Sequence, residues 1–289
     1  MPVLYSYTAM IHLSSSTGPI GVFDSGYGGL TILDKIRGLM PEYDYIYLGD
    51  SARCPYGPRS FEVVYEFTLQ AVSKLFELGC PLVILACNTA SAKALRTIQQ
   101  INLPVIDATR RVLGVIRPTA ECIGEITRSR HVGILATAGT IKSESYLLEI
   151  HKLSPDIVVT GEACPMWVSL VENNEYQSEG ADYFVKQHIN RLLDKDPMID
   201  TIILGCTHYP LLLDKIRQFT PGHIRIIAQG EYVARSLQDY LNRHPEMDAR
   251  CEKGGKCRFL TTESENKFEE SASIFLGRQD IKVESIALE

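Results

Sequence analysis

Short apolar runs rich in Ile and Val alternate along this chain with longer segments of helical period. A strand buried on both faces reads as a continuous apolar run, and such strands joined by helices form parallel sheets. We therefore predict an α/β fold built from βαβ units around mainly parallel sheets flanked by helices. A helix is expected from Ser60 to Gly79, with Ser60 as its N-cap. The strands that matter most are expected at residues 20–23, 82–86, 132–136 and 201–205.

Length and composition are those of an ordinary globular protein of 289 residues. Hydrophobic residues make up 45% and charged residues 22% of the chain, which excludes the disordered and fibrous classes. At about 100–200 residues per domain, this length predicts two domains. The formal net charge of −6 provides no basic field, so neither nucleic acid nor a membrane surface is expected as a partner.

The eight cysteines indicate a reducing compartment. A chain of this size needs no disulfides for stability, and residues 1–17 are typical of neither a secretory signal nor a membrane anchor, so we expect a cytoplasmic protein. Cys251 and Cys257 lack a partnering pair of ligands, and no metal site is expected. Four further cysteines are interpreted as small buried hydrophobic residues: Cys54, Cys80, Cys122 and Cys164.

Two stretches of the chain repeat one order of residue types: an apolar strand, a small residue, Cys, and then hydroxyl or amide side chains. They are VILACNT at 83–89 and IILGCTH at 202–208. A similar strand precedes each of them, IGVFDSG at 20–26 and VGILATA at 132–138. The repeat predicts two related halves; the alternative is a chance match, because apolar runs ending in small residues recur in α/β proteins.

Cys87 and Cys206 stand at the two repeated positions. Ligands of open α/β sheets bind beyond the carboxyl ends of the strands, where N–H groups of the following helices are exposed. The positive end of a helix dipole favours thiolate, so each sulfur is a candidate acid or base. Two thiols facing one carbon from opposite sides can remove a proton from one face and return it to the other. This is the geometry of a racemase that needs no pyridoxal phosphate.

Asp24 and His208 are the expected companions of Cys87 and Cys206, respectively. Asp24 opens the Gly-rich turn DSGYGG, in which backbone amides can approach a carboxylate or phosphate; the alternative is a helix N-cap. His208 is interpreted as a site histidine, with a satisfied core histidine as the alternative. Thr31 stands where a dinucleotide fingerprint requires Gly, so no nicotinamide or flavin site is expected.

Removing a proton next to a carboxylate builds negative charge on that group, so the site must exclude water and donate hydrogen bonds. The side chains expected to donate them are Ser25, Asn88, Thr89, Thr137, Thr140 and Thr207.

Several longer motifs resemble, in order, those of the glutamate racemases in the cofactor-independent aspartate/glutamate racemase superfamily. The resemblance covers residues 20 to 277, nearly the whole chain. It is carried by FDSGYGGL (23–30), LGDSARCPYG (48–57), ACNTASA (86–92), the T-x-x-T-x-x-S pattern (137–143), ACPMWVSLVE (163–172), GCTHYPLL (205–212) and the tail from Phe259 to Gly277.

The resemblance implies roles for individual residues. Cys87 would act on D-glutamate with support from Asp24. Cys206 would act on L-glutamate with support from His208 and Glu172, with Glu175 as the alternative carboxylate. The substrate contacts that it implies are Asp24, Ser25, Tyr56, Gly57, Asn88, Thr89, Thr137, Thr140 and Thr207.

The resemblance also implies an architecture and a setting. Residues 1–17 would be an N-terminal extension, residues 18–107 with 222–289 a first α/β domain, and residues 108–221 a second, with the site in the cleft between them. A homodimer without cofactor or metal is expected, supplying D-glutamate for peptidoglycan. The alternatives are an aspartate or hydantoin racemase, a decarboxylase, or a non-catalytic ligand-binding protein on the same scaffold.

Overall fold

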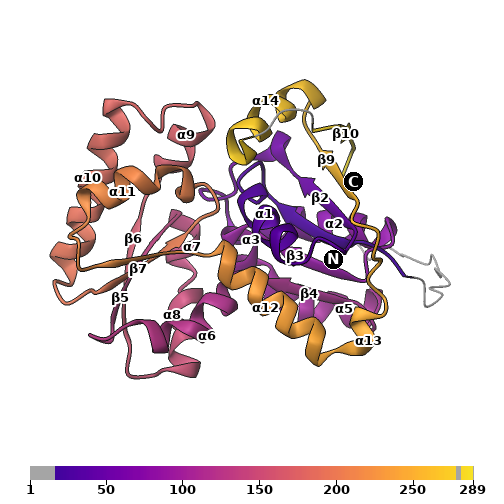
Figure 1. Ribbon diagram of the computed structural model, residues 1–289, viewed down its shortest axis with the longest axis horizontal. Helices are drawn as coiled ribbons and strands as arrows, with labels where there is room; N and C mark the ends of the chain where they lie inside the picture. Colours follow the sequence, from indigo (N-terminus) through magenta and orange to yellow (C-terminus); the bar gives the residue numbers. More distant parts are fainter. Residues whose placement is uncertain (1–16, 278–280, 289) are drawn as a thin grey trace, which may run out of the picture.

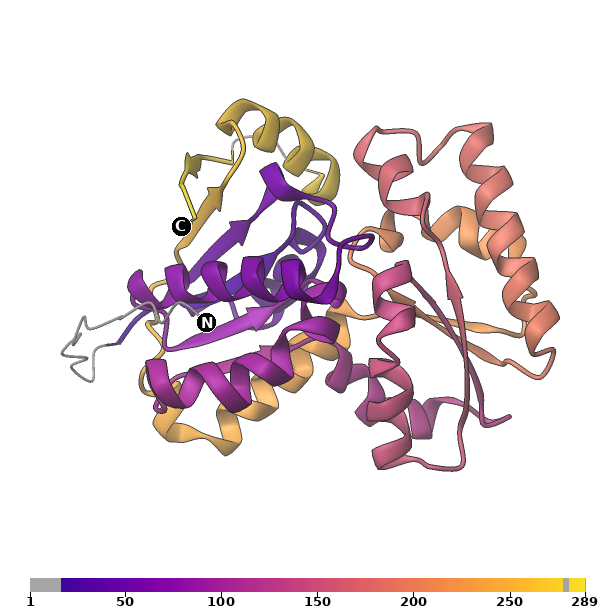
Figure 2. The ribbon, with the colours of Figure 1, turned by 180° about the vertical axis from the view of Figure 1, so that it is seen from behind.

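The computed structural model describes residues 17–277 and 281–288. Of the expected N-terminal extension, residues 1–16 lie outside this range. Two α/β units stand side by side, each built around its own sheet (Figure 1). Figure 2 shows that the C-terminal segment, in yellow, returns to the unit that contains the first strands of the chain. The predicted fold class is confirmed.

A six-stranded sheet with the order β10-β9-β2-β1-β3-β4 forms the core of the first unit, and each of its strand pairs is parallel. The strands β1, β2 and β3 are buried along their whole length, as continuous apolar runs predict. The strands of this sheet are β1 (Ile20–Asp24), β2 (Tyr45–Gly49), β3 (Leu82–Leu85), β4 (Arg111–Gly114), β9 (Cys257–Thr261) and β10 (Val283–Ser285).

A four-stranded parallel sheet with the order β6-β5-β7-β8 forms the core of the second unit. Its strands are β5 (His131–Ala136), β6 (Val158–Ala163), β7 (Thr201–Gly205) and β8 (Arg225–Ala228). Within the larger sheet, β2-β1-β3-β4 follows the same order, in which the first strand of each set pairs with the second and the third. The two related halves predicted from the repeated motifs are therefore present as one topology used twice.

Helices cover both faces of each sheet. The helices of the first unit are α1 (Leu30–Leu39), α2 (Phe61–Glu77), α3 (Asn88–Lys93), α4 (Leu95–Thr97), α5 (Leu103–Ile106), α12 (Gly230–Arg243), α13 (Pro245–Asp248) and α14 (Glu265–Leu276). Those of the second unit are α6 (Ile116–Ile126), α7 (Ala138–Lys142), α8 (Ser145–Leu153), α9 (Trp167–Glu172), α10 (Glu179–Lys195) and α11 (Leu213–Phe219). Short turns of other helical types occupy Ser51–Arg53, Ile98–Asn102 and Tyr209–Leu212.

The predicted helix after Ser60 is present as α2, and the Ser60 side chain accepts a hydrogen bond from the Val63 amide at 3.3 Å. This bond satisfies one of the amides that the first helical turn leaves without a partner. Val64, Ala71 and Leu75 are fully buried on one face of α2. The apolar stripe read from the sequence therefore packs α2 onto the first sheet, in the same hydrophobic cluster as β3.

The chain crosses between the units twice, between β4 and α6 and between β8 and α12. β4 still belongs to the first sheet and β8 to the second, so both crossings fall a few residues beyond the limits expected at 107 and 222. Both strands lie at sheet edges and have one fully buried residue each, Val112 and Ile227. Such strands carry little apolar signal in the sequence.

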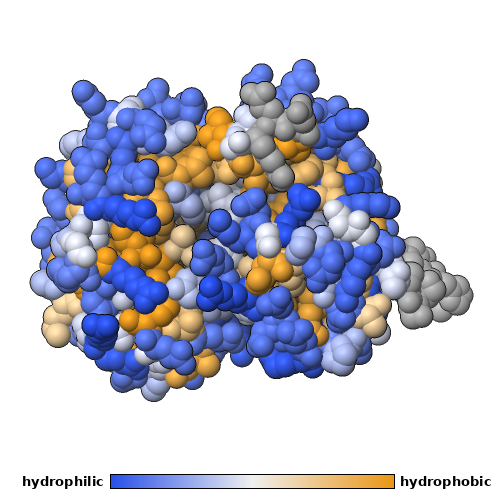
Figure 3. Space-filling view, viewed as in Figure 1, coloured by the Kyte–Doolittle hydropathy of each residue, from blue (hydrophilic) through white to orange (hydrophobic). Residues whose placement is uncertain are grey.

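The surface shown in Figure 3 is largely hydrophilic, with hydrophobic side chains gathered mainly over the second unit. Across the described ranges, none of the helices has both the length and the apolar character required to span a bilayer.

Candidate active site

The predicted site residues lie at the carboxyl ends of equivalent strands. Asp24 is the last residue of β1, and Cys87 follows β3 within two residues. In the second unit, Thr137 follows β5 and Cys206 follows β7 directly. Since these strands pair in the same way in both sheets, the two cysteines occupy corresponding places in the two units.

Hydrogen bonds between the units show that these strand ends face each other. The hydroxyls of Thr89 and Thr137 are 3.0 Å apart, and the Thr207 hydroxyl donates to Asp24 Oδ2 at 3.4 Å. The Thr140 hydroxyl lies 3.1 Å from Thr137 and 3.4 Å from Thr89, so three hydroxyls from both units form one cluster. The predicted residues of the two halves therefore share a single site.

Cys87 is the N-cap of α3, and its sulfur accepts a hydrogen bond from the Ala90 amide at 3.4 Å. Its thiol donates to the Ser25 hydroxyl at 3.5 Å. Burial, together with the negative charge of Asp24, raises the pKa of Cys87 to about 12. The expected preference for thiolate is therefore wrong for Cys87, because burial outweighs the helix dipole. A negative charge on Cys206 also adds to this rise.

Asp24 is fully buried, and burial raises its pKa against the opposing effects of the His208 charge and of the Gly26 amide. Its Oδ1 accepts a hydrogen bond from the Gly26 amide at 3.0 Å. The helix that follows, α1, has Gly29 as its N-cap and no side-chain cap. The alternative interpretation of Asp24 as a helix N-cap is therefore wrong.

Cys206, His208 and Glu172 form a chain of contacts. The Cys206 sulfur is 3.9 Å from His208 Nδ1, and His208 Nε2 is 3.1 Å from Glu172 Oε1. Burial alone would lower the pKa of His208, but its hydrogen bonds to Cys206 and Glu172 outweigh burial and raise the pKa to about 10. His208 therefore carries a positive charge beside the Cys206 sulfur at neutral pH.

The helix-terminus environment expected for Cys206 is absent. The chain turns through residues 206–208 and then enters the short Tyr209–Leu212 turn of 3₁₀ helix, whose N-cap is His208. The charged environment of the Cys206 sulfur therefore comes from a side chain, His208, rather than from an α-helix dipole.

Glu172, at the end of α9, is the carboxylate that contacts His208. Glu175 is exposed, and its described hydrogen bonds, to Leu170 and Ser178, are made by its backbone. Burial works to raise the pKa of Glu172, but the hydrogen bond and the charge of His208 prevail and lower it. The Cys54 thiol also donates to Glu172 Oε1, at 3.0 Å. Interpreting Cys54 as an inert core residue missed this contact; its place in the LGDSARCPYG motif was the available signal.

Tyr56 and Gly57, the last two residues of the LGDSARCPYG motif, each make a described hydrogen bond within the protein. The Tyr56 hydroxyl donates to the buried carboxylate of Asp50, and the Gly57 carbonyl accepts a hydrogen bond from the Gly139 amide at 3.1 Å. The Asn88 amide, next to Cys87, is bound by two residues that the sequence did not indicate, Tyr146 and Gln229.

Gly28 makes close packing between the two halves possible. A Cβ atom at Gly28 would lie 2.3 Å from the Thr207 hydroxyl and 2.5 Å from His208 Nδ1, closer than non-bonded atoms approach. Sequence reasoning treated this glycine only as part of a turn. The structure shows that it leaves room for the side chains that follow Cys206.

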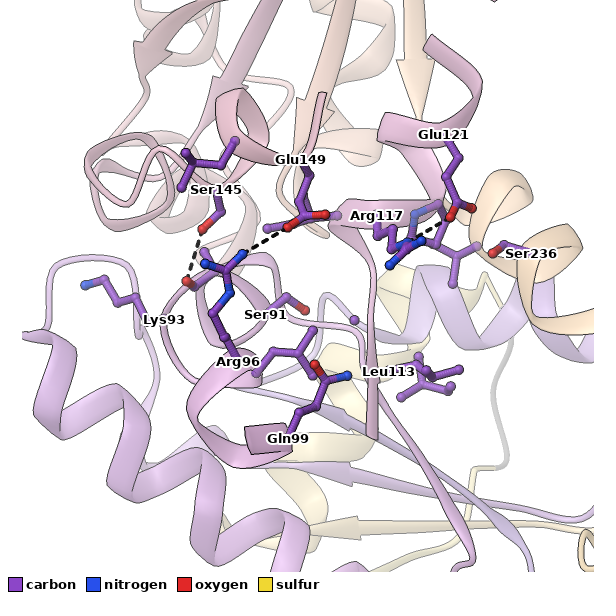
Figure 4. A pocket seen from close by; sticks show the side chains of 18 of the residues that line it. Ser91, Lys93, Arg96, Gln99, Leu113, Arg117, Glu121, Ser145, Glu149 and Ser236 are labelled. Atoms are coloured by element: carbon purple, nitrogen blue, oxygen red, sulfur yellow. Dashed lines mark hydrogen bonds and ion pairs between the residues drawn. The ribbon is translucent and has the colours of Figure 1, made fainter. Parts of the chain in front are cut away.

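A cavity of about 740 Å³ lies elsewhere between the units, lined by parts of α3, α6, α8 and α12. Figure 4 shows its charged side chains, with Arg96 paired to Glu149 at 3.4 Å and Arg117 to Glu121 at 2.8 Å. None of the predicted site residues lines it. In the part of the chain that the structure covers, His, Cys, Asp and Glu side chains form no group of three that could hold a metal ion.

Comparison with known proteins identifies the class first. The family model described as Asp/Glu/Hydantoin racemase matches residues 31–237, and the chain belongs to this family of isomerases. Its relatives within the family include a glutamate racemase from a Ruegeria species, 38% identical over 270 residues that cover 90% of this chain and 97% of the relative.

Solved structures of glutamate racemases share the whole fold. The structure from Bacillus anthracis has a TM-score of 0.84 and 36% identity, covering 93% of this chain and 97% of the other. The structure from Francisella tularensis in complex with D-glutamate has a TM-score of 0.82 and 32% identity, covering 94% and 98%. These findings confirm the resemblance that the motifs indicated.

Proposed function

We propose that this protein is a glutamate racemase, in which Cys87 and Cys206 exchange a proton with opposite faces of the α-carbon. The observation that carries the proposal is the placement of these cysteines at corresponding strand ends of two like units that share one site. Similarity to glutamate racemases over at least 90% of the chain supports the choice of substrate.

For L-glutamate, Cys206 acts as the base, beside the positive charge of His208. The α-C–H bond breaks, its proton moves to Cys206, and the electron pair passes into the substrate carboxylate. Cys87, held as a thiol by burial, then gives its proton to the opposite face and becomes thiolate. The reverse reaction uses Cys87 as the base, and its high pKa makes that thiolate a strong one.

The supporting residues hold charge in fixed places. Glu172 keeps His208 charged, and the buried Asp24 sustains the high pKa of Cys87. Hydrogen bonds to the negative charge that develops on the substrate would come from the hydroxyl cluster and the neighbouring polar side chains. The donors proposed for this role are Ser25, Asn88, Thr89, Thr137, Thr140 and Thr207.

We infer a setting from the same chemistry. Within residues 17–277 and 281–288 the structure describes no disulfide, which fits a reducing cytoplasm. The family resemblance supports a homodimer, which sedimentation analysis would test, and a role in supplying D-glutamate for peptidoglycan. The proposed proton transfer assigns every step to residues of this chain, without a cofactor.

The test is incubation of the protein with L-glutamate in D2O, following optical rotation and Cα deuteration together. Rotation should decay to zero. Early in the reaction, deuterium should appear in D-glutamate but not in recovered L-glutamate, because the incoming hydrogen comes from a second, solvent-exchanged thiol. Unchanged rotation without deuterium uptake would reject racemisation. Faster turnover of aspartate or a hydantoin would instead favour another member of the family.

A further inference from the structure

We propose that Tyr146 and Gln229 are positioning residues that hold the amide of Asn88 with an N–H toward the substrate. This inference rests on the proposed function, because it requires glutamate to bind beside Cys87. Asn88 follows Cys87 at the start of α3, Tyr146 lies in α8 of the second unit, and Gln229 lies where the chain crosses from β8 to α12.

The three side chains form a closed ring of hydrogen bonds. Asn88 Nδ2 donates to Gln229 Oε1 at 2.7 Å, Gln229 Nε2 donates to the Tyr146 hydroxyl at 2.7 Å, and that hydroxyl donates to Asn88 Oδ1 at 2.6 Å. All three residues are at least 97% buried. Because water cannot replace a broken bond there, each member of the ring constrains the other two.

The direction of the ring is fixed by the backbone. Gln229 Nε2 also donates to the Val115 carbonyl oxygen at 3.0 Å, and a carbonyl oxygen can only accept. Gln229 must therefore turn its Oε1 toward Asn88, so Asn88 must present its Nδ2 there. A reversed Asn88 amide would set two acceptor oxygens against each other.

This orientation gives Asn88 a donor for the site. Nδ2 carries two hydrogens, one of which goes to Gln229, and among the described residues no acceptor takes the other. A free N–H suits a carboxylate, whereas a reversed amide would offer an oxygen and repel it. The ring also connects the two segments in which the chain crosses between the units, because Val115 lies in the first of these segments and Gln229 in the second. A shift of one unit against the other would break the ring and release the Asn88 amide.

The decisive variant is Tyr146→Phe, which removes one hydroxyl and keeps the ring of the side chain. The matched control is Tyr45→Phe, because Tyr45 is equally buried and its hydroxyl donates to the Met40 carbonyl at 2.7 Å, within the first unit. We expect Tyr146→Phe to raise KM for both enantiomers about fivefold or more with a smaller change in kcat, as loss of a ground-state contact predicts. The control should stay within about twofold of the wild type.

Asn88→Ala separates positioning from a direct effect on Cys206, whose charge contributes to the pKa of the Tyr146 hydroxyl. In the Asn88→Ala background, Tyr146→Phe should change KM by less than about twofold, because the group it positions is gone. Gln229→Ala should behave like Tyr146→Phe. Melting temperatures show whether each variant is folded.

Three outcomes would overturn the proposal. The first is an unchanged KM in folded Tyr146→Phe, and the second is a Tyr146→Phe effect that persists fully in the Asn88→Ala background. Either one, with a wild type that racemises glutamate, rejects the positioning role and leaves the proposed function standing. The third is a wild type that turns over no glutamate, which rejects the proposed function and this inference with it.

Discussion

The Thr207 hydroxyl lies 3.4 Å from Asp24 Oδ2, so the residue after Cys206 contacts the carboxylate that raises the pKa of Cys87. The Thr31 hydroxyl lies 3.1 Å from the Thr207 carbonyl oxygen and donates to it, so Thr207 makes two hydrogen bonds to the first unit. The surroundings of the two thiols are therefore connected. A change on one side of the site is expected to disturb proton transfer on the other.

Replacing either cysteine should stop racemisation. Cys87→Ala and Cys206→Ala each remove one of the two proposed proton carriers, and we expect kcat to fall about a thousandfold or more, as loss of a general acid or base predicts. The fold should persist, because the loss of one small side chain costs about 1 kcal/mol of a much larger total. Circular dichroism and polarimetry provide the two measurements. Substantial racemisation by either folded variant would exclude the paired-thiol mechanism.

Gly28→Ala should damage the site more than the fold. Its new Cβ would meet Thr207 and His208, and displacing these side chains should lower kcat/KM about a hundredfold. Gly38→Ala is the matched control, because nothing lies within 4 Å of a Cβ at Gly38 in α1. The control should keep its activity and gain about 0.5–1 kcal/mol of stability, as Ala replaces Gly in a helix. Equal activity in the two variants would contradict the packing role assigned to Gly28.

The pair of His208 and Glu172 should make stability depend on pH in the alkaline range. The pKa of His208 is raised from 6.5 to about 10 in the folded state. Its contribution is therefore complete below the unfolded pKa and declines as pH rises, until it is lost above the folded pKa. Glu172→Gln keeps an acceptor for His208 and removes the charge. Between about pH 6.5 and 10, the unfolding free energy of the wild type should fall by about 1–2 kcal/mol more than that of Glu172→Gln.

Urea unfolding at the two ends of this range measures the difference directly, and comparing the two proteins cancels the titration of other groups. Parallel losses of stability in the wild type and in Glu172→Gln would show that this carboxylate does not hold the charge on His208.

The features that the sequence predicts best are those encoded in a short, continuous pattern of residues. Cys87 and Cys206 are recognisable because each follows a buried apolar strand and precedes polar residues, and the paired topology of β1–β3 and β5–β7 follows from the same pattern. The edge strands β4 and β8 are short and half-exposed, so their assignment to a sheet is not visible in the sequence.

Contacts between the units are the part that local pattern does not encode. Cys54 and Glu172 are 118 positions apart in the chain, and Asn88 and Gln229 are 141 apart. No periodicity connects such residues, so a contact between them cannot be predicted from either stretch of sequence alone. The raised pKa of Cys87 could not be predicted from the sequence either. The sequence indicates the helix whose dipole favours thiolate, but not the depth of burial that favours the thiol.

Cys54 is expected to affect kcat/KM through its hydrogen bond to Glu172. Its thiol shares Oε1 of Glu172 with His208, so Cys54→Ala should raise the pKa of Glu172 and lower kcat/KM about threefold to tenfold. The value of kcat/KM must fall by the same factor for L- and D-glutamate. The ratio of the two values equals the equilibrium constant, which is unity because enantiomers have equal free energies. Cys54→Ser should restore much of the activity by supplying a hydroxyl donor. Cys122→Ala is the control, because Cys122 donates to the Thr119 carbonyl within α6, away from the site. Equal losses in Cys54→Ala and Cys54→Ser would show that packing, and not the hydrogen bond to Glu172, is what Cys54 contributes.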